Sequence, residues 1–445
     1  MTRGLDDVGD FAGAIWRSPP RKRGVFLRTR LVESGGTAVR VRRLGGDRAG
    51  EIRITRFLRN PAVTIEEMMA TTAARTHRCV AGRHVLAIQD TTMVRSAAEG
   101  LGVALHPLIA VDAVTGTLLG LVSAEFFVRE GGKRDKRARP FAHKESRRWH
   151  TGIQHAAALA AAGAASVTVV MDREADIYED FAEKPQAVEL LVRASHDRIC
   201  ADGSRLFAKA EALPEAGRMT IELPAAPGRT ARTAVLALRT GTVEIARPKG
   251  RPRAATAATL PASLVLTMID ACEIDPPPGV EPAHWRLLTT HSVTRVGDAR
   301  RIVGFYRARW TIEQLFRTLK SQGFQVEALR LTAQGPFEKL VAATLIAAVS
   351  VLQLVHERDG VAQRPLADAF DPDEQSILET ISASLEGKTI RQKNPHPKGS
   401  LAFAAWVMAR LGGWTGYYGK AGPIVMLHGL TRYHAIKHGW SLRNV

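Results

Sequence analysis

Residues 305–324 read FYRARWTIEQLFRTLKSQGF, and their polar and apolar residues alternate with the period of an α-helix. At about 3.6 residues per turn, one stripe of this helix carries a hydroxyl, a carboxylate and several cations, from Tyr306, Arg309, Glu313, Arg317 and Lys320. The other face is apolar and suits burial against a core, with Phe305, Ile312, Leu315, Phe316 and Leu319. The spacing predicts a single amphipathic helix.

The polar stripe of this helix has two interpretations. Glu313 could hold a divalent metal ion while the Tyr306 hydroxyl and the cations bind phosphate oxygens, which would make the helix half of a phosphoryl-transfer site. Alternatively, Arg and Glu at this spacing form an ordinary solvated face, in which each pair contributes only a few tenths of a kcal/mol. The segment alone favours the solvated face, and the rest of the chain reverses that preference.

The composition indicates a folded protein with a positive field. The 445 residues include 62 Lys and Arg against 44 Asp and Glu, a formal net charge of +18, and 45% of the residues are hydrophobic. Such a chain can bury a large core and is expected to hold roughly two to four domains. The charge points to a polyanionic partner, most simply DNA or RNA. Charge alone does not distinguish a nucleic-acid-binding protein from one that binds membrane surfaces or acidic ligands.

Several features bear on the compartment. Cys79, Cys200 and Cys272 lie far apart and form no CxxC pair, which argues against a disulfide framework or a zinc knuckle. The N-terminus has no apolar signal core. The longest apolar run, residues 340–354, is shorter than the ~20 residues of a membrane span, so it predicts a buried helix. We therefore expect a soluble protein of a reducing cytosol, with no membrane partner.

The first 70 residues are expected to form a small helical DNA-binding domain. Lys and Arg are concentrated there, and the residues assigned to DNA phosphates are Arg21, Lys22, Arg23, Arg28 and Arg30. An ordinary basic surface is the alternative. Within the tract RFLRNPAVTIEEMM, residues 56–69, Thr64 and Glu67 form a T-x-x-E capping box, which predicts that a helix begins at residue 64.

Two short apolar segments each end in an aspartate. Residues 84–89 predict a buried strand before Asp90, and residues 167–171 predict another before Asp172. Between them the sequence predicts a hairpin formed by residues 107–112 and 118–122. A helix is predicted to follow at about residues 151–162.

The rest of the chain divides into a β-rich and a helical part. Alternating strands predominate from about residue 197 to 288, with a Pro-, Ala- and Arg-rich loop between the last two. From about residue 331 the chain reads as helical, with segments at residues 337–357, 373–385 and 403–411. We place domain boundaries accordingly, at residues 1–70, 71–330 and 331–445.

The carboxyl ends of strands in an α/β sheet are where ligands and catalytic groups gather. Asp90, Asp172 and Glu313 could there hold two divalent ions that activate a water or a 3′-hydroxyl and stabilise the leaving oxygen of a phosphodiester. Oxygen ligands without a thiolate nearby favour Mg²⁺. Any one of these aspartates is more often a strand-end turn or a helix cap. All three acids together with the cation stripe favour a metal site.

Several motifs carry a resemblance to a known family. IQDTT at 88–92, DREADIY at 172–178 and Y-x2-R-x3-E-x6-K at 306–320 resemble the DDE transposases of the IS-four family, especially the Tn-five type with its Y-R-E-K signature. Tracts similar in order are RFLRNPAVTIEEMM, KES at 144–146, LVRASH at 191–196 and WRLLTT at 285–290. The similarity extends over roughly residues 20–430, and motifs in the right order over this length are far more specific than a single string.

The resemblance implies an α/β fold with an RNase H-like catalytic core, a mostly β insertion at about 197–288, and helical N- and C-terminal domains. It implies that Asp90, Asp172 and Glu313 bind two Mg²⁺ ions, which Mn²⁺ could replace. It further implies that Tyr306, Arg309 and Lys320 hold the DNA backbone at the cut end, that Trp285 stacks on a flipped base, and that Arg193 shapes a hairpin end. Core packing is the alternative for Trp285.

The sequence departs from the Tn-five type in two places. Gln314 follows the glutamate where that type has a second acid, which should not disturb metal binding. The chain ends soon after Trp440, where that type continues into helices that make synaptic dimer contacts, so the mode of dimerisation is open. His428, His434 and His438 lack the spacing of a zinc site and are expected to be exposed or to contact phosphate.

These features predict a cut-and-paste transposase that acts on double-stranded DNA as a homodimer. It would bind the terminal inverted repeats, nick the ends, and use the freed 3′-hydroxyl for a hairpin intermediate and then for strand transfer into target DNA. Two alternatives are another RNase H-like nuclease, such as a resolvase or a domesticated transposase, and a non-catalytic DNA-binding protein derived from a transposase. The presence of all three acids argues against the last.

Overall fold

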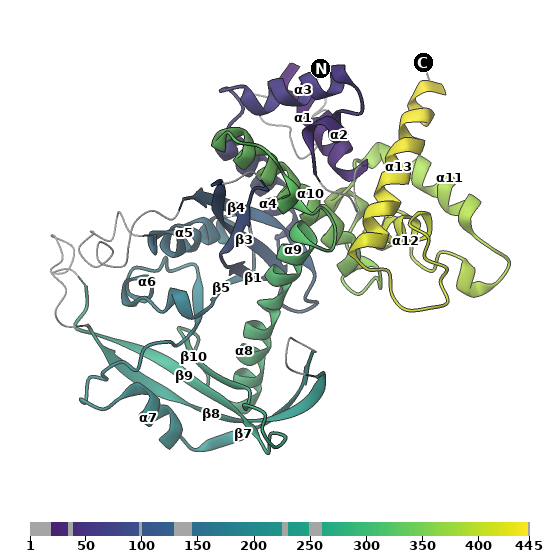
Figure 1. Cartoon of the computed structure of the whole chain (residues 1–445). Coiled ribbons are helices and arrows are strands. Elements are labelled where there is room, and N and C mark those ends of the chain that lie inside the picture. Colours follow the sequence, from purple (N-terminus) through teal and green to yellow (C-terminus); the bar gives the residue numbers. More distant parts are fainter. Residues whose placement is uncertain are drawn as a thin grey trace, which may run out of the picture. The chain divides into compact units, whose positions relative to one another are not determined.

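The computed structural model describes residues 19–33, 39–97, 100–128, 145–224, 230–248 and 260–443. Contacts divide the chain into two compact units (Figure 1). The first contains residues 1–84, 91–129 and 311–445, and the second contains residues 85–90 and 130–310. The chain passes between them more than once, so neither unit is a continuous segment.

Three antiparallel strands and a group of helices make up the first unit. The strands are β2 (Thr92–Arg95), β3 (Gly102–Asp112) and β4 (Leu118–Phe127), and β3 pairs with both of the others. The predicted hairpin is therefore confirmed, with longer strands than the sequence indicated. Its turn is closed by Asp112, whose side chain accepts hydrogen bonds from the backbone N–H groups of Val114 and Thr115, both at 2.9 Å.

Two helices pack against β4, namely α4 (Ile65–Cys79) and α10 (Gln334–Glu357). α4 begins as predicted, since the Thr64 side chain accepts a hydrogen bond from the Glu67 N–H at 3.1 Å. Thr76 of α4 donates to the Leu121 carbonyl at 2.7 Å, and Gln353 of α10 donates to the Leu119 carbonyl at 2.6 Å. Both helices are thus fixed to the backbone of β4 by buried polar contacts as well as by apolar packing.

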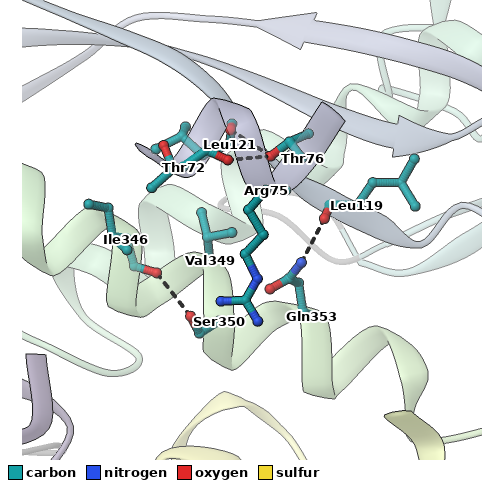
Figure 2. A pocket seen from close by; sticks show the side chains of 10 residues that line it. Thr72, Arg75, Thr76, Leu119, Leu121, Ile346, Val349, Ser350 and Gln353 are labelled. Atoms are coloured by element: carbon teal, nitrogen blue, oxygen red, sulfur yellow. Dashed lines mark hydrogen bonds between the residues drawn. The ribbon is translucent and has the colours of Figure 1, made fainter. Parts of the chain in front are cut away.

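A small cavity lies where these three elements meet (Figure 2). Its volume of about 20 Å³ suits roughly one water molecule. At this point β4 carries Gly120, and a Cβ there would lie 2.3 Å from the Thr76 hydroxyl oxygen. A glycine is therefore required by the close approach of α4, and the cavity is too small for a substrate.

The remaining helices of the first unit come from both ends of the chain. They are α1 (Pro19–Glu33), α2 (Val41–Gly45), α3 (Arg48–Arg59), α9 (Trp310–Lys320), α11 (Gln375–Leu385), α12 (Leu401–Leu411) and α13 (Pro423–Arg443). Helices are present at all three positions predicted after residue 331, and α13 is an additional one. α1 packs on α13, where Thr431 donates to the Val32 carbonyl at 2.7 Å.

α10 is long and apolar enough to cross a membrane by length and composition alone. However, 89% of its most apolar window is buried inside the protein. A buried core helix passes the same test, and the sequence prediction of a buried helix at this position is confirmed.

The second unit is built on a mixed sheet in the order β1-β5-β6-β10-β9-β8-β7. These strands are β1 (His84–Gln89), β5 (Ser166–Met171), β6 (Glu189–Arg193), β7 (Glu215–Leu223), β8 (Arg232–Ala246), β9 (Ser263–Ile274) and β10 (His284–Thr289). β5 and β6 are parallel, and the pairs from β6 to β7 are antiparallel. This mixed α/β arrangement is consistent with an RNase H-like transposase domain.

The β-rich region predicted from about residue 197 to 288 is confirmed by β7, β8, β9 and β10. It also contains one helix that the sequence did not indicate, α7 (Leu206–Ala212). The predicted loop between β8 and β9 falls largely on residues 249–259, which lie outside the described residues, as does Lys144 of the KES tract.

The helix predicted at about residues 151–162 is α5 (Arg147–Ala161), which packs against β5. Gln89, the last residue of β1, is fully buried and donates to the Trp149 carbonyl at 3.2 Å and to the Met171 sulfur at 3.0 Å. One side chain therefore connects β1, α5 and β5 directly before the aspartate that follows β1.

Candidate active site

Asp90 follows β1 directly and is paired with an arginine. Its Oδ2 lies 2.7 Å from Nη1 of Arg309, and the two side chains are only 21% and 11% exposed. A charge-assisted contact of this length in a largely buried setting is stronger than a surface ion pair. Arg309 therefore compensates the charge of Asp90.

Asp172 follows β5 in the same way and is bound by a tyrosine. The Tyr306 hydroxyl donates to Oδ1 of Asp172 at 3.1 Å. Burial of the phenol and the neighbouring Asp172 carboxylate raise the pKa of Tyr306 to about 12. The hydroxyl therefore keeps its proton at neutral pH and can act as a hydrogen-bond donor to an oxygen anion.

These two pairs touch each other. The Arg309 guanidinium lies 5.9 Å from the centroid of the Tyr306 ring, within the range of a cation–π contact. Because β1 and β5 are neighbours in the sheet, both aspartates leave adjacent strands. The structure thus brings Asp90, Asp172, Tyr306 and Arg309 into one continuous polar cluster.

The predicted single helix from residue 306 to residue 320 is wrong. α8 (Val296–Ala308) ends before Arg309 and α9 begins at Trp310, with the Arg309 N–H bonded to the Tyr306 carbonyl at 3.1 Å. The Arg309 backbone stays in the right-handed helical region, at φ −53° and ψ −28°. A hydrogen bond to the third preceding residue instead of the fourth tightens the turn, so the polar stripe is interrupted at Arg309.

Glu313 lies in the first turn of α9, four residues after Arg309. The apolar face predicted for this segment buries Ile312, Leu315 and Leu319, while Phe305 and Phe316 are half-buried. Because the first turn of a helix presents unpaired N–H groups, it is a favourable place for a carboxylate.

Lys320 ends α9 and has contacts within the first unit. Its Nζ donates to the Met93 carbonyl and lies 3.6 Å from Oε1 of Glu327. This lysine is about one-quarter exposed, which leaves part of its ammonium group accessible to solvent.

Trp285 and Arg193 lie on the central strands β10 and β6. The Trp285 ring is half-buried, and its centroid is 5.8 Å from that of Tyr306 with the planes tilted by 60°. Arg193 donates to the His284 carbonyl at 3.0 Å. Trp285 therefore stands beside a residue of the polar cluster and is not fully enclosed in the core.

Among the N-terminal cations, Arg28 and Arg30 lie on α1. Arg30 pairs with Glu33 at 2.7 Å and donates to the Leu44 carbonyl at 2.6 Å, so it connects α1 to α2. Arg21, Lys22 and Arg23 belong to α1 by backbone, and their side chains lie outside the described residues.

A family model described as Transposase DDE domain matches residues 104–350, which is more than half of the 445-residue chain. The chain belongs to this family of DDE transposases. Asp172, Arg193, Trp285, Tyr306, Arg309, Glu313 and Lys320 all lie inside the matched range, whereas Asp90 and the N-terminal cations precede it. The family acts on DNA, and its members generally use divalent metal ions.

The donors of the polar cluster suit such an ion. Asp90 and Asp172 offer only hard carboxylate oxygens, which Mg²⁺ and Mn²⁺ prefer, and they leave adjacent strands. Within the described residues, however, no three His, Cys, Asp or Glu side chains are gathered closely enough to hold a metal ion. The two aspartates are therefore residues of the right type for a divalent metal ion. In this structure the positively charged Arg309 lies next to Asp90, where such an ion would bind.

Sequence reasoning missed the role of a second aspartate in DREADIY. Asp176 is fully buried and accepts hydrogen bonds from the N–H groups of Ser195 and His196 at 2.8 and 2.9 Å. Its Oδ1 also lies 2.6 Å from Nη2 of Arg198, which is 9% exposed. Asp176 thus connects the DREADIY motif to the end of the LVRASH motif. In the sequence, the only sign of this contact was that the two motifs follow one another in the order that the resemblance implies.

Proposed function

We propose that this DDE transposase performs cut-and-paste transposition. It would bind the terminal inverted repeats of its element, nick the 3′ ends, and join them to target DNA through a hairpin intermediate. The observation that carries the proposal is the cluster at the ends of β1 and β5, in which Asp172 contacts Tyr306 and Asp90 contacts Arg309.

We assign the metal ligands to Asp90, Asp172 and Glu313. When bound there, two Mg²⁺ or Mn²⁺ ions would lower the pKa of a water or 3′-hydroxyl and stabilise the leaving oxygen of the phosphodiester. Asp90 and Asp172 are fixed by the rigid strands that precede them, and Glu313 by the first turn of α9. Support from regular elements limits the movement of the ligands.

The other signature residues are assigned to the DNA backbone. Arg309 offers a planar guanidinium that can bind two oxygens of one phosphate, whereas Lys320 provides a single point charge. Tyr306 keeps its proton because its pKa is about 12, so its hydroxyl can donate to a phosphate oxygen. These groups would position the scissile phosphate rather than move protons.

Two further roles follow the same assignment. The half-buried Trp285 ring has a flat face on which an unstacked base can rest. Arg193, on the adjacent strand β6, would help to shape a hairpin end. Arg21, Lys22, Arg23, Arg28 and Arg30 would bind phosphates of the terminal repeats, and their contribution would weaken as salt rises. Two protomers would hold the two ends of the element.

The test is cleavage of labelled duplexes that carry the element's own terminal repeats, with Mg²⁺, by the wild type, by Glu313→Ala and by a control variant, Glu281→Ala. Glu281 is an exposed residue of the loop between β9 and β10. Cleavage at the repeat boundary by the wild type and the control, with Glu313→Ala binding but not cutting, would support the proposal.

Two other outcomes would contradict it. Specific binding without cleavage by the wild type would favour a non-catalytic DNA-binding protein. Equal cutting by the wild type and Glu313→Ala would mean that the site is assigned to the wrong residues. A nuclease of a related kind, such as a resolvase, would cut without joining the freed 3′ ends to target DNA.

A further inference from the structure

The contact between Arg309 and Asp90 joins a proposed DNA ligand to a proposed metal ligand. Nη1 of Arg309 is 2.7 Å from Oδ2 of Asp90, and both side chains are largely shielded from water. While this contact lasts, the N–H group that faces Asp90 is occupied, and a phosphate would have to bind another part of the guanidinium. A metal ion on Oδ2 of Asp90 would lie next to Nη1 of Arg309, so metal binding by Asp90 competes with the contact that the structure contains.

We propose that Arg309 is a coupling residue, which covers Asp90 until DNA draws it away and thereby makes divalent-metal binding and DNA binding depend on each other. This inference rests on the proposed function, because it takes Asp90 as a metal ligand and Arg309 as a phosphate ligand. It adds an order of events to that site, in which metal and DNA enter together rather than independently.

Electrostatics gives the direction of the coupling. A divalent cation on Asp90 would be placed next to the positive charge of Arg309, and repulsion between like charges is strong in a site that excludes water. Metal binding alone must therefore displace the guanidinium from its partner. A DNA phosphate offers the displaced guanidinium a new anion with matching geometry, which reduces the cost of that displacement.

The same argument holds in the reverse direction. If a phosphate draws Arg309 away first, Asp90 loses a positively charged partner in a largely buried position, and it binds a cation more tightly. Coupling free energy between two ligands is reciprocal, so DNA must raise the affinity for metal by the factor by which metal raises the affinity for DNA.

A shift of Arg309 would be felt by its neighbours. This residue stands at the junction between α8 and α9, outside both helices. The Arg309 side chain also lies against the ring of Tyr306. The hydroxyl of this tyrosine in turn donates a hydrogen bond to Asp172. A shift of Arg309 would therefore change the surroundings of Tyr306 and of Trp285, whose ring is 5.8 Å from that tyrosine.

The test measures Mn²⁺ binding to the full chain by calorimetry, with and without a duplex of the element's terminal sequence. The variants are Arg309→Gln, which removes the charge, and Arg309→Lys, which keeps it. Arg301→Gln is the matched control, because Arg301 pairs with Asp298 at 3.2 Å on α8 and its own side chain is 54% exposed. Circular dichroism establishes that each variant is folded.

We expect DNA to tighten Mn²⁺ binding about tenfold in the wild type, the size of a typical coupling between two sites. Arg309→Gln should bind Mn²⁺ about tenfold more tightly without DNA, and DNA should add little further. Arg309→Lys should retain weak binding without DNA, and Arg301→Gln should match the wild type. In the wild type, Mn²⁺ should also change the fluorescence of Trp285 when DNA is present, as judged against Trp285→Phe.

Asp90→Asn separates the two ways in which the idea can fail. If Asp90→Asn binds Mn²⁺ as the wild type does, or if the wild type binds none, then the proposed metal site is wrong and this inference fails with it. If Mn²⁺ binding needs Asp90 but is the same in wild type and Arg309→Gln, with coupling to DNA intact, only the role of Arg309 is overturned.

Discussion

The two aspartates of DREADIY should respond to mutation in opposite ways. Asp172 is half-buried and contacts Tyr306, whereas Asp176 is fully buried and contacts Arg198 together with two backbone N–H groups. We therefore expect Asp176→Asn to lower the free energy of unfolding and to leave metal binding intact. Asp172→Asn should abolish metal binding and leave stability nearly unchanged.

The magnitude follows from the burial of the pair. Asn at position 176 still presents an oxygen to the N–H groups of Ser195 and His196, so those bonds are retained. The substitution removes the negative charge that balances the guanidinium of Arg198. This guanidinium is in a side chain that is only 9% exposed, so water cannot replace the lost carboxylate unless the segment moves. Removing one partner of a buried pair costs about 3–5 kcal/mol. For a domain of this size that lowers the melting temperature by about 6–20 °C.

The assay is urea unfolding followed by circular dichroism, beside Mn²⁺ calorimetry on the same preparations. The double variant Asp176→Asn/Arg198→Met removes both charges and should be more stable than Asp176→Asn alone, because no guanidinium is left uncompensated. The single variant Arg198→Met completes the cycle: if its loss and that of Asp176→Asn simply add in the double variant, or if Asp176→Asn unfolds at the wild-type urea concentration, the argument from burial is refuted.

Three further effects on stability should be measurable. Burial raises the pKa of Glu357 to about 6, so the folded protein favours the protonated acid; the contribution of Glu357 to stability is fully present below the ordinary pKa of 4.5 and is lost, by about 2 kcal/mol, as the pH rises through 6. Buried His356 and His434 have lowered pKa values and act in the opposite direction, so urea unfolding at pH 5 and pH 7.5 should show the wild type losing stability relative to Glu357→Gln as the pH rises. Gly120→Ala should cost about 1–3 kcal/mol because the new Cβ would meet the Thr76 hydroxyl at 2.3 Å, and an unchanged urea midpoint would contradict this close approach. Thr64→Ala should cost about 1 kcal/mol through the lost cap of α4, with Thr64→Ser restoring stability in the same measurement.

Much of the fold follows from local patterns in the sequence. The strand before Asp90 and the strand before Asp172 are apolar, short and bounded by turn residues, and both β1 and β5 lie where these signals placed them. The start of α4 follows from a capping residue whose bond is present. Such features depend on neighbours in the chain, which the sequence contains directly.

The parts that were missed depend on contacts between distant residues. The break at Arg309 has no proline or glycine to announce it, and helical periodicity continues through the segment. Arg309 there contacts Asp90, a residue more than two hundred positions away, and no window of sequence contains both. Similarly, Asp176 looks like a second acid of a catalytic motif until Arg198 is found beside it.

Gln314 takes part in another contact between residues that are distant in the sequence. Nδ1 of His356 accepts a hydrogen bond from the Leu118 N–H at 3.1 Å, and its Nε2 lies 3.3 Å from Oε1 of Gln314. Burial lowers the pKa of His356 to about 4, so the ring is neutral at pH 7 and carries its one proton on Nε2. Gln314 therefore needs only to accept this proton's hydrogen bond.

An amide oxygen meets that need as well as a carboxylate would, and it adds no negative charge next to Glu313. A carboxylate at position 314 would bring a second negative charge to the first turn of α9, next to Glu313. The amide anchors α9 to α10 through His356 while the acidic character of the turn stays with one residue.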